Sequence, residues 1–287
     1  MEKDILALLA NGNGGFSKGQ KRIAQYILDN YDKAAFMTAG RLGETVGVSE
    51  STVVRFAAEL GYDGYPSMRK ALQEMIRSRL TSVQRIEVAR QTLNTDNLIR
   101  SVISADSETL EMTLSECDRD SFDRAAEAII SAKRVYIVGM RSSACLANFL
   151  GFYFNILLEN VFIIHDTAVS EVYEQMMRIS EGDVFIGISY PRYSSRTLRA
   201  MRFAKSTGAS VIGITDADSS PFVGVADTLL YAKSNMVSFL DSLVAPLSLI
   251  NALIVSVGAK LDTDIESTFN RLESIWRDYE VYETGEM

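Results

Sequence analysis

Five short apolar runs, rich in Val and Ile, recur at intervals of about 25 residues in the second half of the chain. They lie at 135–138, 161–164, 184–188, 211–214 and 228–231, and helical stretches of about 12–20 residues separate most of them. Apolar runs without alternation are typical of strands buried on both faces. The pattern therefore predicts a parallel sheet built from βαβ units and covered by helices.

Helical patterns flank these runs. Ser121 is expected to cap an amphipathic helix that reaches Lys133, and two further helices are expected at about 239–260 and 264–282. The longest apolar stretch, from Leu243 to Ala259, contains Pro246 and falls short of the ~20 residues needed to span a bilayer. We expect a buried helix there and no membrane partner.

The first eighty residues have an all-helical pattern. Ser17, Thr38 and Ser49 each stand where an N-cap hydroxyl is favoured, ahead of apolar residues at helical spacing. Gly47 stands where a helix ends in the left-handed conformation, and Pro66 is a favoured first-turn residue for a further helix.

Residues 38–60 thus read as helix, tight Gly turn, helix. In a helix-turn-helix unit the N-terminal residues of the second helix meet base edges in the DNA major groove, and nearby cations meet phosphates. The alternative is a small helical interaction domain with solvated charges. The candidate base-reading residues are Ser49, Glu50, Ser51, Thr52 and Arg55, and the candidate phosphate contacts are Lys18, Lys21, Arg22 and Arg41.

The net charge of −8 argues against nucleic-acid binding only until it is divided along the chain. Residues 1–80 hold 11 Lys and Arg against 9 Asp and Glu, while residues 81–287 hold 18 against 28. Because a domain of charge +2 neutralises few phosphates, tight operator binding is expected to depend on oligomerisation. An isolated 1–80 fragment is expected to bind more weakly than the full chain.

Residues 79–120 contain no strand-like run and no Pro, so one or two amphipathic helices are expected, broken near 94–97. A one-sided apolar stripe of this kind needs a cover, which a second copy of the chain would supply.

Few residues suit metal or disulfide chemistry. Cys117, Cys145 and His165 are the only cysteines and histidine, so we expect a reduced cytoplasm and no metal site. The N-terminus lacks a positive region before an apolar core, so no signal peptide is expected. No P-loop and no intact Gly-x-Gly-x-x-Gly occurs, so we expect neither ATP nor NAD as a cofactor.

Polar and cationic residues follow the first, third and fourth predicted strands. In open α/β sheets ligands bind beyond the carboxyl ends of strands, and helix N-termini there suit anions. The cations stand out in residues 81–287, whose net charge is −10, which favours an anionic ligand. The alternative is that the serines only cap helices and the arginines are solvated. The candidate ligand residues are Gly139, Arg141, Ser142, Ser143, Ser189, Arg192, Ser194, Arg196, Thr215 and Asp216.

The N-terminal residues resemble those of RpiR-type bacterial transcriptional regulators. The resemblance covers about residues 16–78 and rests on Val48-Ser-Glu-Ser-Thr-Val-Val-Arg-Phe56, followed by Leu60-Gly-Tyr-Asp-Gly-Tyr-Pro66. It implies that this domain binds operator DNA.

Residues 121–260 resemble the sugar isomerase (SIS) domain, which binds phosphosugars and is the usual partner of that N-terminal domain. The family motif Gly-x-Gly-x-Ser-x-x-x-Ala corresponds to Gly139 through Ala147, with Arg141 in place of the second Gly. The motif Ser-x-Ser-Gly-x-Thr corresponds to Ser189 through Ser194, with Arg192 in place of Gly. Because arginine adds charge and a bidentate fork, the replacements favour a more acidic ligand, such as a sugar-acid phosphate.

Catalysis is the main rival to regulation. A sugar-phosphate isomerase needs a general base, and His165, Glu171 and Glu174 follow the second predicted strand. A lone histidine at a strand end is more often structural, so we do not expect an enzyme. Asp241 and Ser242 are expected to open the long C-terminal helix and to contact ligand instead.

The resemblances predict a ligand-controlled regulator. The expected fold class is α/β: an all-α helix-turn-helix domain at 1–80, a helical connector at 81–120, and a SIS domain at 121–287. The SIS domain is expected to be a three-layer sandwich with a five-stranded parallel sheet. Expected partners are operator DNA, a phosphorylated sugar or sugar-acid effector, and further copies in a homodimer or homotetramer. The alternatives are an isomerase with an appended helical domain and a ligand-sensing adaptor that binds protein.

Overall fold

The computed structural model describes residues 5, 8–9, 15–77, 80–92, 97–165, 168–236, 240–261 and 265–282. Two compact units make up the chain, and the sequence passes between them three times. Unit 1 holds Met1–Ala105 with Asn235–Ser242, and unit 2 holds Asp106–Ser234 with Leu243–Met287. The division at 80 and 120 stays a prediction from sequence.

Unit 1 is helical, and its helices enclose one apolar core that includes Ile23, Leu42, Phe56 and Met68. Ser17 closes a capping box at the start of α2 (Lys18–Asp29). Thr38 accepts a hydrogen bond from Arg41 N–H at 3.2 Å at the start of α4 (Ala39–Val46). Both caps agree with the sequence prediction. The helices are α2 (Lys18–Asp29), α3 (Tyr31–Ala34), α4 (Ala39–Val46), α5 (Glu50–Glu59), α6 (Gly64–Arg77) and α7 (Ser82–Thr92), and α8 (Leu98–Glu116) starts in this unit.

Unit 2 contains a five-stranded sheet with the strand order β2-β1-β3-β4-β5, in which all neighbours are parallel. The predicted parallel sheet is therefore confirmed. Ile137, Ile186 and Ile212 lie in register across the three central strands and are buried. The strands are β1 (Val135–Gly139), β2 (Val161–Ile164), β3 (Val184–Ile188), β4 (Ser210–Thr215) and β5 (Thr228–Tyr231).

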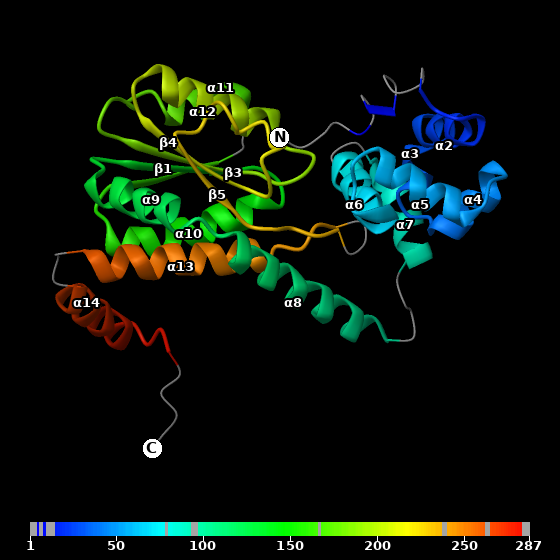
Figure 1. Ribbon diagram of the computed structural model, residues 1–287. Coiled ribbons are helices and arrows are strands. Elements are labelled where there is room, and N and C mark those ends of the chain that lie inside the picture. Colours follow the sequence, from blue (N-terminus) through cyan, green and yellow to red (C-terminus); the bar gives the residue numbers. More distant parts are fainter. Residues whose placement is uncertain are drawn as a thin grey trace. The chain divides into compact units, whose positions relative to one another are not determined.

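Helices cover both faces of this sheet (Figure 1). One core lies between the sheet and α9, α10 and α13, and a second lies between the sheet and α11 and α12. The predicted three-layer arrangement is thus present. The helices are α9 (Arg119–Ser131), α10 (Ser143–Leu157), α11 (Val169–Gln175), α12 (Ser195–Ser206), α13 (Val244–Lys260) and α14 (Ile265–Asp278).

Three predicted helix starts were wrong. α6 starts at Gly64, so Pro66, the start predicted for this helix, is its third residue. Asp118 caps α9 in place of Ser121, whose hydroxyl donates to the Asp118 carboxylate and helps to lower the pKa of that carboxyl. The long C-terminal helix starts at Val244, because an antiparallel bridge joins Met236 to Asp241 ahead of it.

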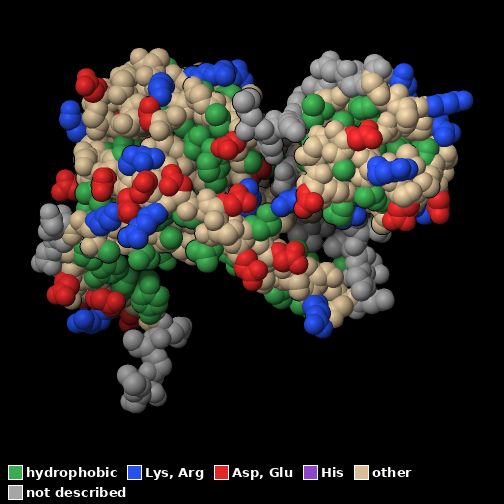
Figure 2. Space-filling model, in the orientation of Figure 1, with side chains coloured by type: hydrophobic (Ala, Val, Ile, Leu, Met, Phe, Trp, Pro, Cys, Tyr) green, Lys and Arg blue, Asp and Glu red, His purple; other side chains and the backbone are tan. Residues whose placement is uncertain are grey.

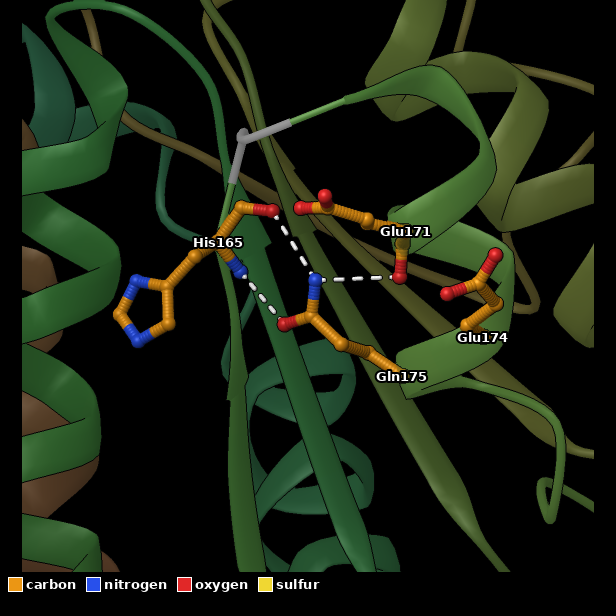
Figure 3. Close-up of a pocket in the computed structure, with 4 residues that line it drawn as sticks. All are labelled: His165, Glu171, Glu174 and Gln175. Atoms are coloured by element: carbon orange, nitrogen blue, oxygen red, sulfur yellow. Dashed lines mark hydrogen bonds between the residues drawn. The ribbon is translucent and has the colours of Figure 1, made fainter.

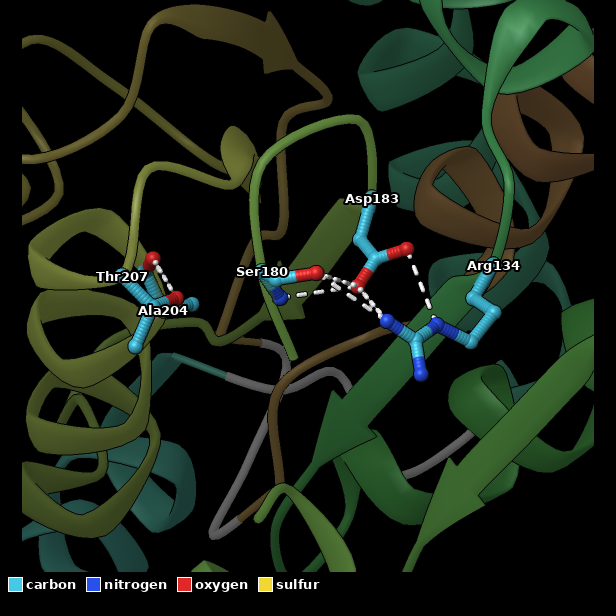
Figure 4. Close-up of polar contacts among 5 residues, drawn as sticks. All are labelled: Arg134, Ser180, Asp183, Ala204 and Thr207. Carbon is cyan, nitrogen blue, oxygen red and sulfur yellow. Dashed lines mark hydrogen bonds and ion pairs between the residues drawn. The ribbon is translucent and has the colours of Figure 1, made fainter. Parts of the chain in front are cut away.

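An ion pair joins the amino ends of β1 and β3. Arg134 precedes β1 and donates from Nε and a terminal nitrogen to both oxygens of the buried Asp183 carboxylate, at 3.0 and 2.9 Å (Figure 4). Ser180 N–H donates to the same carboxylate at 2.8 Å. The ion pair therefore ties the start of β1 to the start of β3.

In the part of the chain that the structure describes, no single helix is long and apolar enough to cross a membrane. α13 and α14 reach that length and composition only as a pair bent by 113°.

Candidate functional site

The first candidate site is built on α4, a tight turn and α5. Gly47 has φ of 70°, the left-handed conformation predicted from the sequence. The helices approach closely there, because a Cβ added at Gly43 would lie 2.8 Å from the Val48 carbonyl oxygen. Ser49 caps α5 and accepts from Thr52 N–H at 3.3 Å. The segment has the geometry of a helix-turn-helix.

The predicted base-reading residues lie together on the first turns of α5. Ser49, Glu50, Ser51 and Arg55 are exposed, and Thr52 is half-buried. The Ser49 hydroxyl lies 2.9 Å from that of Ser51 and 2.8 Å from that of Thr52. The hydroxyls therefore form a linked group at the positive end of the helix dipole, where phosphate or base acceptors are favoured.

The predicted phosphate contacts are all exposed: Lys18 and Lys21 with Arg22 on α2, and Arg41 on α4. Arg22 also has a structural role that was not predicted from the sequence. Its guanidinium donates to the Gly47 carbonyl at 2.8 Å and so ties α2 to the turn before α5. A glycine turn with exposed carbonyls after a basic helix is the signal that would have indicated this contact.

The second candidate site lies at the carboxyl ends of β1 and β3. From these neighbouring strands the chain continues to opposite sides of the sheet, through α10 beyond β1 and through α12 beyond β3. A ligand crevice is expected at such a switch point. The segments there are 139–143 and 189–194, which carry most of the predicted ligand residues.

Arg141 and Arg192 have a conformation that the sequence did not predict. Their φ angles are 57° and 65°, in the left-handed region, and both side chains are exposed. This conformation costs a non-Gly residue about 1–2 kcal/mol. The arginines thus keep the backbone that Gly adopts readily at the two positions where the motifs have Gly. Strain of this kind is concentrated at functional sites.

The serines at this edge differ in role. Ser194 caps α12, accepting from Thr197 N–H at 3.3 Å, and its own N–H donates to the Ser189 hydroxyl at 3.0 Å. Ser142 is exposed and makes no cap hydrogen bond, while Ser143 is buried as the first residue of α10. The cap-only alternative therefore describes Ser194 and does not describe Ser142.

Gly139 brings α10 close to β1. A Cβ added at this residue would lie 2.3 Å from the Ser143 carbonyl oxygen and 3.1 Å from Ala147 Cβ. The Gly and the Ala of the first motif are therefore explained by close strand-to-helix packing at the edge of the site.

A buried polar floor lies behind the arginines. The Asp216 carboxylate accepts from the Tyr193 hydroxyl at 2.8 Å and from the Thr215 hydroxyl at 3.3 Å. The hydroxyls of Tyr190 and Thr197 are buried without a hydrogen-bond partner among the described residues. Burial, with the nearby Asp216 charge, raises the pKa of Tyr190 well above its ordinary value, so this phenol stays a neutral donor. Unpartnered buried hydroxyls are rare, so a water or a polar ligand is needed to satisfy these two.

Arg196 lies half-buried in the first turn of α12. With it, the predicted ligand residues that follow β1, β3 and β4 are all placed at the carboxyl edge of one sheet. Their roles toward a ligand stay a prediction.

An open hollow of about 440 Å³ lies at the end of β2, lined by His165, Glu171, Glu174 and Gln175. The Gln175 amide joins the His165 backbone in both directions, at 3.0 and 3.2 Å (Figure 3). The imidazole ring points away from both glutamates (Figure 3). The geometry fits a structural histidine at a strand end.

Comparison with known proteins follows the two units. Residues 3–79 match the rpiR-family helix-turn-helix domain, and residues 128–256 match the SIS domain. The chain thus combines an rpiR-family helix-turn-helix domain with a SIS domain. Curated relatives of similar length include an HTH-type transcriptional regulator of Caldanaerobacter subterraneus subsp. tengcongensis, 24% identical over 91% of this chain and 93% of that protein. HexR of Pseudomonas aeruginosa is 24% identical over 94% of this chain and 95% of its own.

Two solved structures share the fold. Vibrio vulnificus NanR, complexed with ManNAc-6P, has a TM-score of 0.59 at 21% identity and covers 96% of this chain and 99% of its own. The sugar isomerase domain of an RpiR transcription factor from Sphaerobacter thermophilus has a TM-score of 0.59 at 27% identity, over 62% of this chain and 99% of its own.

Proposed function

We propose that this chain is an RpiR-type transcriptional regulator whose operator binding is controlled by a phosphorylated sugar or sugar-acid effector in the SIS domain. The observation that carries the proposal is the pair of left-handed arginines, Arg141 and Arg192, at the mouth of the switch-point site. Both side chains are exposed, so they are accessible to a ligand.

The effector is proposed to lie across the ends of β1 and β3. Its phosphate would meet the N-terminal turns of α10 and α12 and the hydroxyls of Ser142, Ser143 and Ser194. Sugar hydroxyls would donate to Asp216 and accept from the buried Tyr190 and Thr197 hydroxyls. Gly139, Ser189 and Thr215 shape the floor, and Arg141, Arg192 and Arg196 would pair with phosphate or with a carboxylate. The structure of NanR complexed with ManNAc-6P, which shares this fold, supports a phosphosugar as the class of effector.

The α5 helix is proposed to read the operator. Ser49, Glu50, Ser51, Thr52 and Arg55 would face base edges, while Lys18, Lys21, Arg22 and Arg41 would face phosphates. A regulator of this kind acts in the cytoplasm, where chromosomal DNA lies. The 1–80, 81–120 and 121–287 division remains our proposal for its domains.

A homodimer or homotetramer is proposed as the active form. Hydrophobic side chains gather over α14 and the adjoining part of α13 (Figure 2). Phe269 and Ile275 on α14 are exposed, as are Val255 on α13 and Phe152 on α10. None of the α14 residues that the structure describes is buried, so this amphipathic helix has an apolar side for a second copy to cover.

A thermal-shift screen of phosphorylated sugars and sugar acids tests the effector class, because ligand binding to the native state raises the unfolding midpoint by mass action. We expect at least one phosphorylated compound to raise the midpoint and its unphosphorylated parent to have no effect. A screen in which no phosphorylated compound shifts the midpoint would remove the proposed function.

Two further experiments separate the alternatives. A gel shift on DNA upstream of the chain's own gene distinguishes a regulator from an adaptor that binds protein. An NMR time course with the compound that binds distinguishes sensing from isomerisation. We expect no turnover, since the His165 ring lies turned away from Glu171 and Glu174. Accumulating ketose or aldose product would establish the isomerase instead.

A further inference from the structure

A short segment between β5 and α13 belongs to unit 1, which carries the proposed DNA-reading helix α5 and is called the reading unit below. Residues 235–242, here called the tab, group with unit 1, although the strand before them and the helix after them belong to unit 2. Met236 packs against the core of unit 1. The tab closes on itself, because Met236 bridges to Asp241 and Ser242 N–H donates to the Asn235 carbonyl at 2.9 Å.

An ion pair anchors the tab. The Arg85 guanidinium on α7 donates to the Asp241 carboxylate at 2.7 Å, and only 2% of the Arg85 side chain and 16% of the Asp241 side chain are exposed. Removing one partner of a buried ion pair is destabilising, so the contact favours the docked tab. The expected ligand contact of Asp241 is replaced here by a contact with Arg85.

α7 is itself tied into unit 1. The neighbouring residue Gln84 donates from its amide to the Asp32 carboxylate on α3 at 3.1 Å. The tab therefore holds a helix that is fastened to the helices of the reading unit.

The chain segments on both sides of the tab belong to unit 2 and contact elements that carry the candidate effector site. On one side, Ala232 N–H donates to the carbonyl of Thr215, a predicted ligand residue, at 2.8 Å. On the other side α13 packs along α10, whose first turn follows Arg141 and Ser142. A shift of either segment on ligand binding is carried by continuous chain into the tab.

We propose that the Arg85–Asp241 ion pair is the link through which effector binding in the SIS domain biases the placement of the DNA-reading helices. The inference rests on the proposed function. Arg85 and Asp241 are positioning residues, because neither is proposed to touch effector or DNA. An effector changes operator affinity only if it binds two conformational states of the protein with different affinity. In this proposal the tab connects the conformation of the effector site to that of the DNA-reading helices.

The test uses the full chain with the substitution Asp241→Asn, and Met236→Ser as a second variant that loosens the tab without leaving a charge unpaired. The DNA probe is a duplex selected by the wild-type chain from a random pool. The ligand probe is the compound with the largest thermal shift in the screen described above. Asp123→Asn is the matched control, since it removes a carboxylate that pairs with Lys260 at the far end of α13.

Operator affinity is measured by fluorescence anisotropy with and without the ligand probe, and the ratio of the two is the coupling factor. We expect both tab variants to bring this factor to within twofold of one, while ligand affinity in calorimetry changes less than threefold. Asp123→Asn should keep the wild-type factor, and the reversed pair Arg85→Asp with Asp241→Arg should restore at least half of it.

Folded tab variants, judged by circular dichroism, that keep the wild-type coupling factor would overturn the link. Failure of the proposed function is distinguishable, because a wild-type chain that selects no DNA or binds no phosphorylated compound fails before any variant is compared. If Asp241→Asn alone unfolds, Met236→Ser decides the outcome by the same ratio.

Discussion

At the residue scale, Arg141 and Arg192 hold a backbone conformation that Gly adopts at lower free energy. We expect Arg141→Gly and Arg192→Gly each to raise the free energy of unfolding by about 0.5–1 kcal/mol, since relief of the left-handed strain outweighs the added chain entropy of Gly. The same variants should lose effector affinity. Urea unfolding and calorimetry measure the two effects.

The controls are Ala substitutions at the same two positions and a Gly substitution in a helix, where the backbone is right-handed. Arg141→Ala and Arg192→Ala should abolish the effector response without the gain in stability, because Ala keeps the Cβ. Arg199→Gly, in the interior of α12, should cost about 1 kcal/mol. Full effector affinity in the Arg141 and Arg192 variants would show that the pocket lies elsewhere.

Tyr65 gives the reading unit a sensitivity to alkaline pH. Burial raises the pKa of the Tyr65 phenol to about 12, with Arg69 opposing, and its hydroxyl donates to the Met37 carbonyl at 3.0 Å. The folded state thus holds this proton more tightly than the unfolded chain, whose tyrosines titrate near pH 10. The stabilisation is complete below about pH 10 and is lost as the pH rises through 12.

We therefore expect Tyr65→Phe to flatten the fall of the unfolding midpoint between pH 10 and 12, measured by circular dichroism. Tyr279→Phe replaces an exposed tyrosine and should keep the wild-type profile. A Tyr65→Phe curve parallel to wild type across that range would contradict the assignment.

Site residues at this scale were predictable by position and less so by conformation. Strand ends in an α/β pattern identify the edge where a ligand binds, so the positions of Arg141 and Ser189 followed from the sequence. The left-handed backbone of the arginines did not, because propensity favours right-handed φ for every non-Gly residue. The unpartnered hydroxyls of Tyr190 and Thr197 depend on packing that no local pattern records.

At the element scale, α10 packs on β2 through a glycine. A Cβ added at Gly151 would lie 2.4 and 2.5 Å from side-chain carbons of Ile163, whereas one at Gly258 on α13 meets nothing nearer than 3.7 Å. We expect Gly151→Ala to destabilise the protein by about 1–3 kcal/mol through overpacking. Gly258→Ala should instead stabilise it by up to about 1 kcal/mol through helix propensity.

Chemical denaturation of both variants makes this comparison, with Gly258→Ala as the control for the loss of a helical Gly. Equal effects of the two substitutions would show that the close approach of α10 to β2 relaxes without cost.

Element types were more predictable than element ends. The strands at 161–164, 184–188 and 228–231 match the predicted runs. Only β3 among them is buried along its whole length, as the unbroken apolar signal predicts. The edge strands β2 and β5 carry the same apolar signal and are partly exposed. The start of α9 was wrong since Asp118 and Ser121 are both good caps and their competition is decided by local hydrogen bonds. The start of α13 was wrong because a tertiary contact of Asp241 overrides helical periodicity.

At the scale of the whole molecule, operator binding should involve two reading helices. With few cations on each copy, we expect two chains per pair of operator half-sites and a shallow slope of log affinity against log salt concentration. Sedimentation on labelled duplex gives the stoichiometry, and anisotropy between 50 and 200 mM KCl gives the slope. Ser49→Ala should weaken binding and also cost about 1 kcal/mol as a lost cap.

Binding by a single chain with the affinity of the full assembly would contradict this expectation. Thr38→Ala is a suitable control, because it removes the α4 cap and leaves the proposed reading face of α5 intact.

The triple passage of the chain between its units restricts how such regulators can be recombined. A hybrid that joins the first 105 residues of this protein to the sensor of another such regulator would lack the carboxylate that neutralises Arg85. Its reading unit would carry a foreign segment where residues 235–242 dock. A working hybrid should therefore include residues 235–242 of this protein as well as its first 105 residues. The two pieces form one module although they are separate in the sequence.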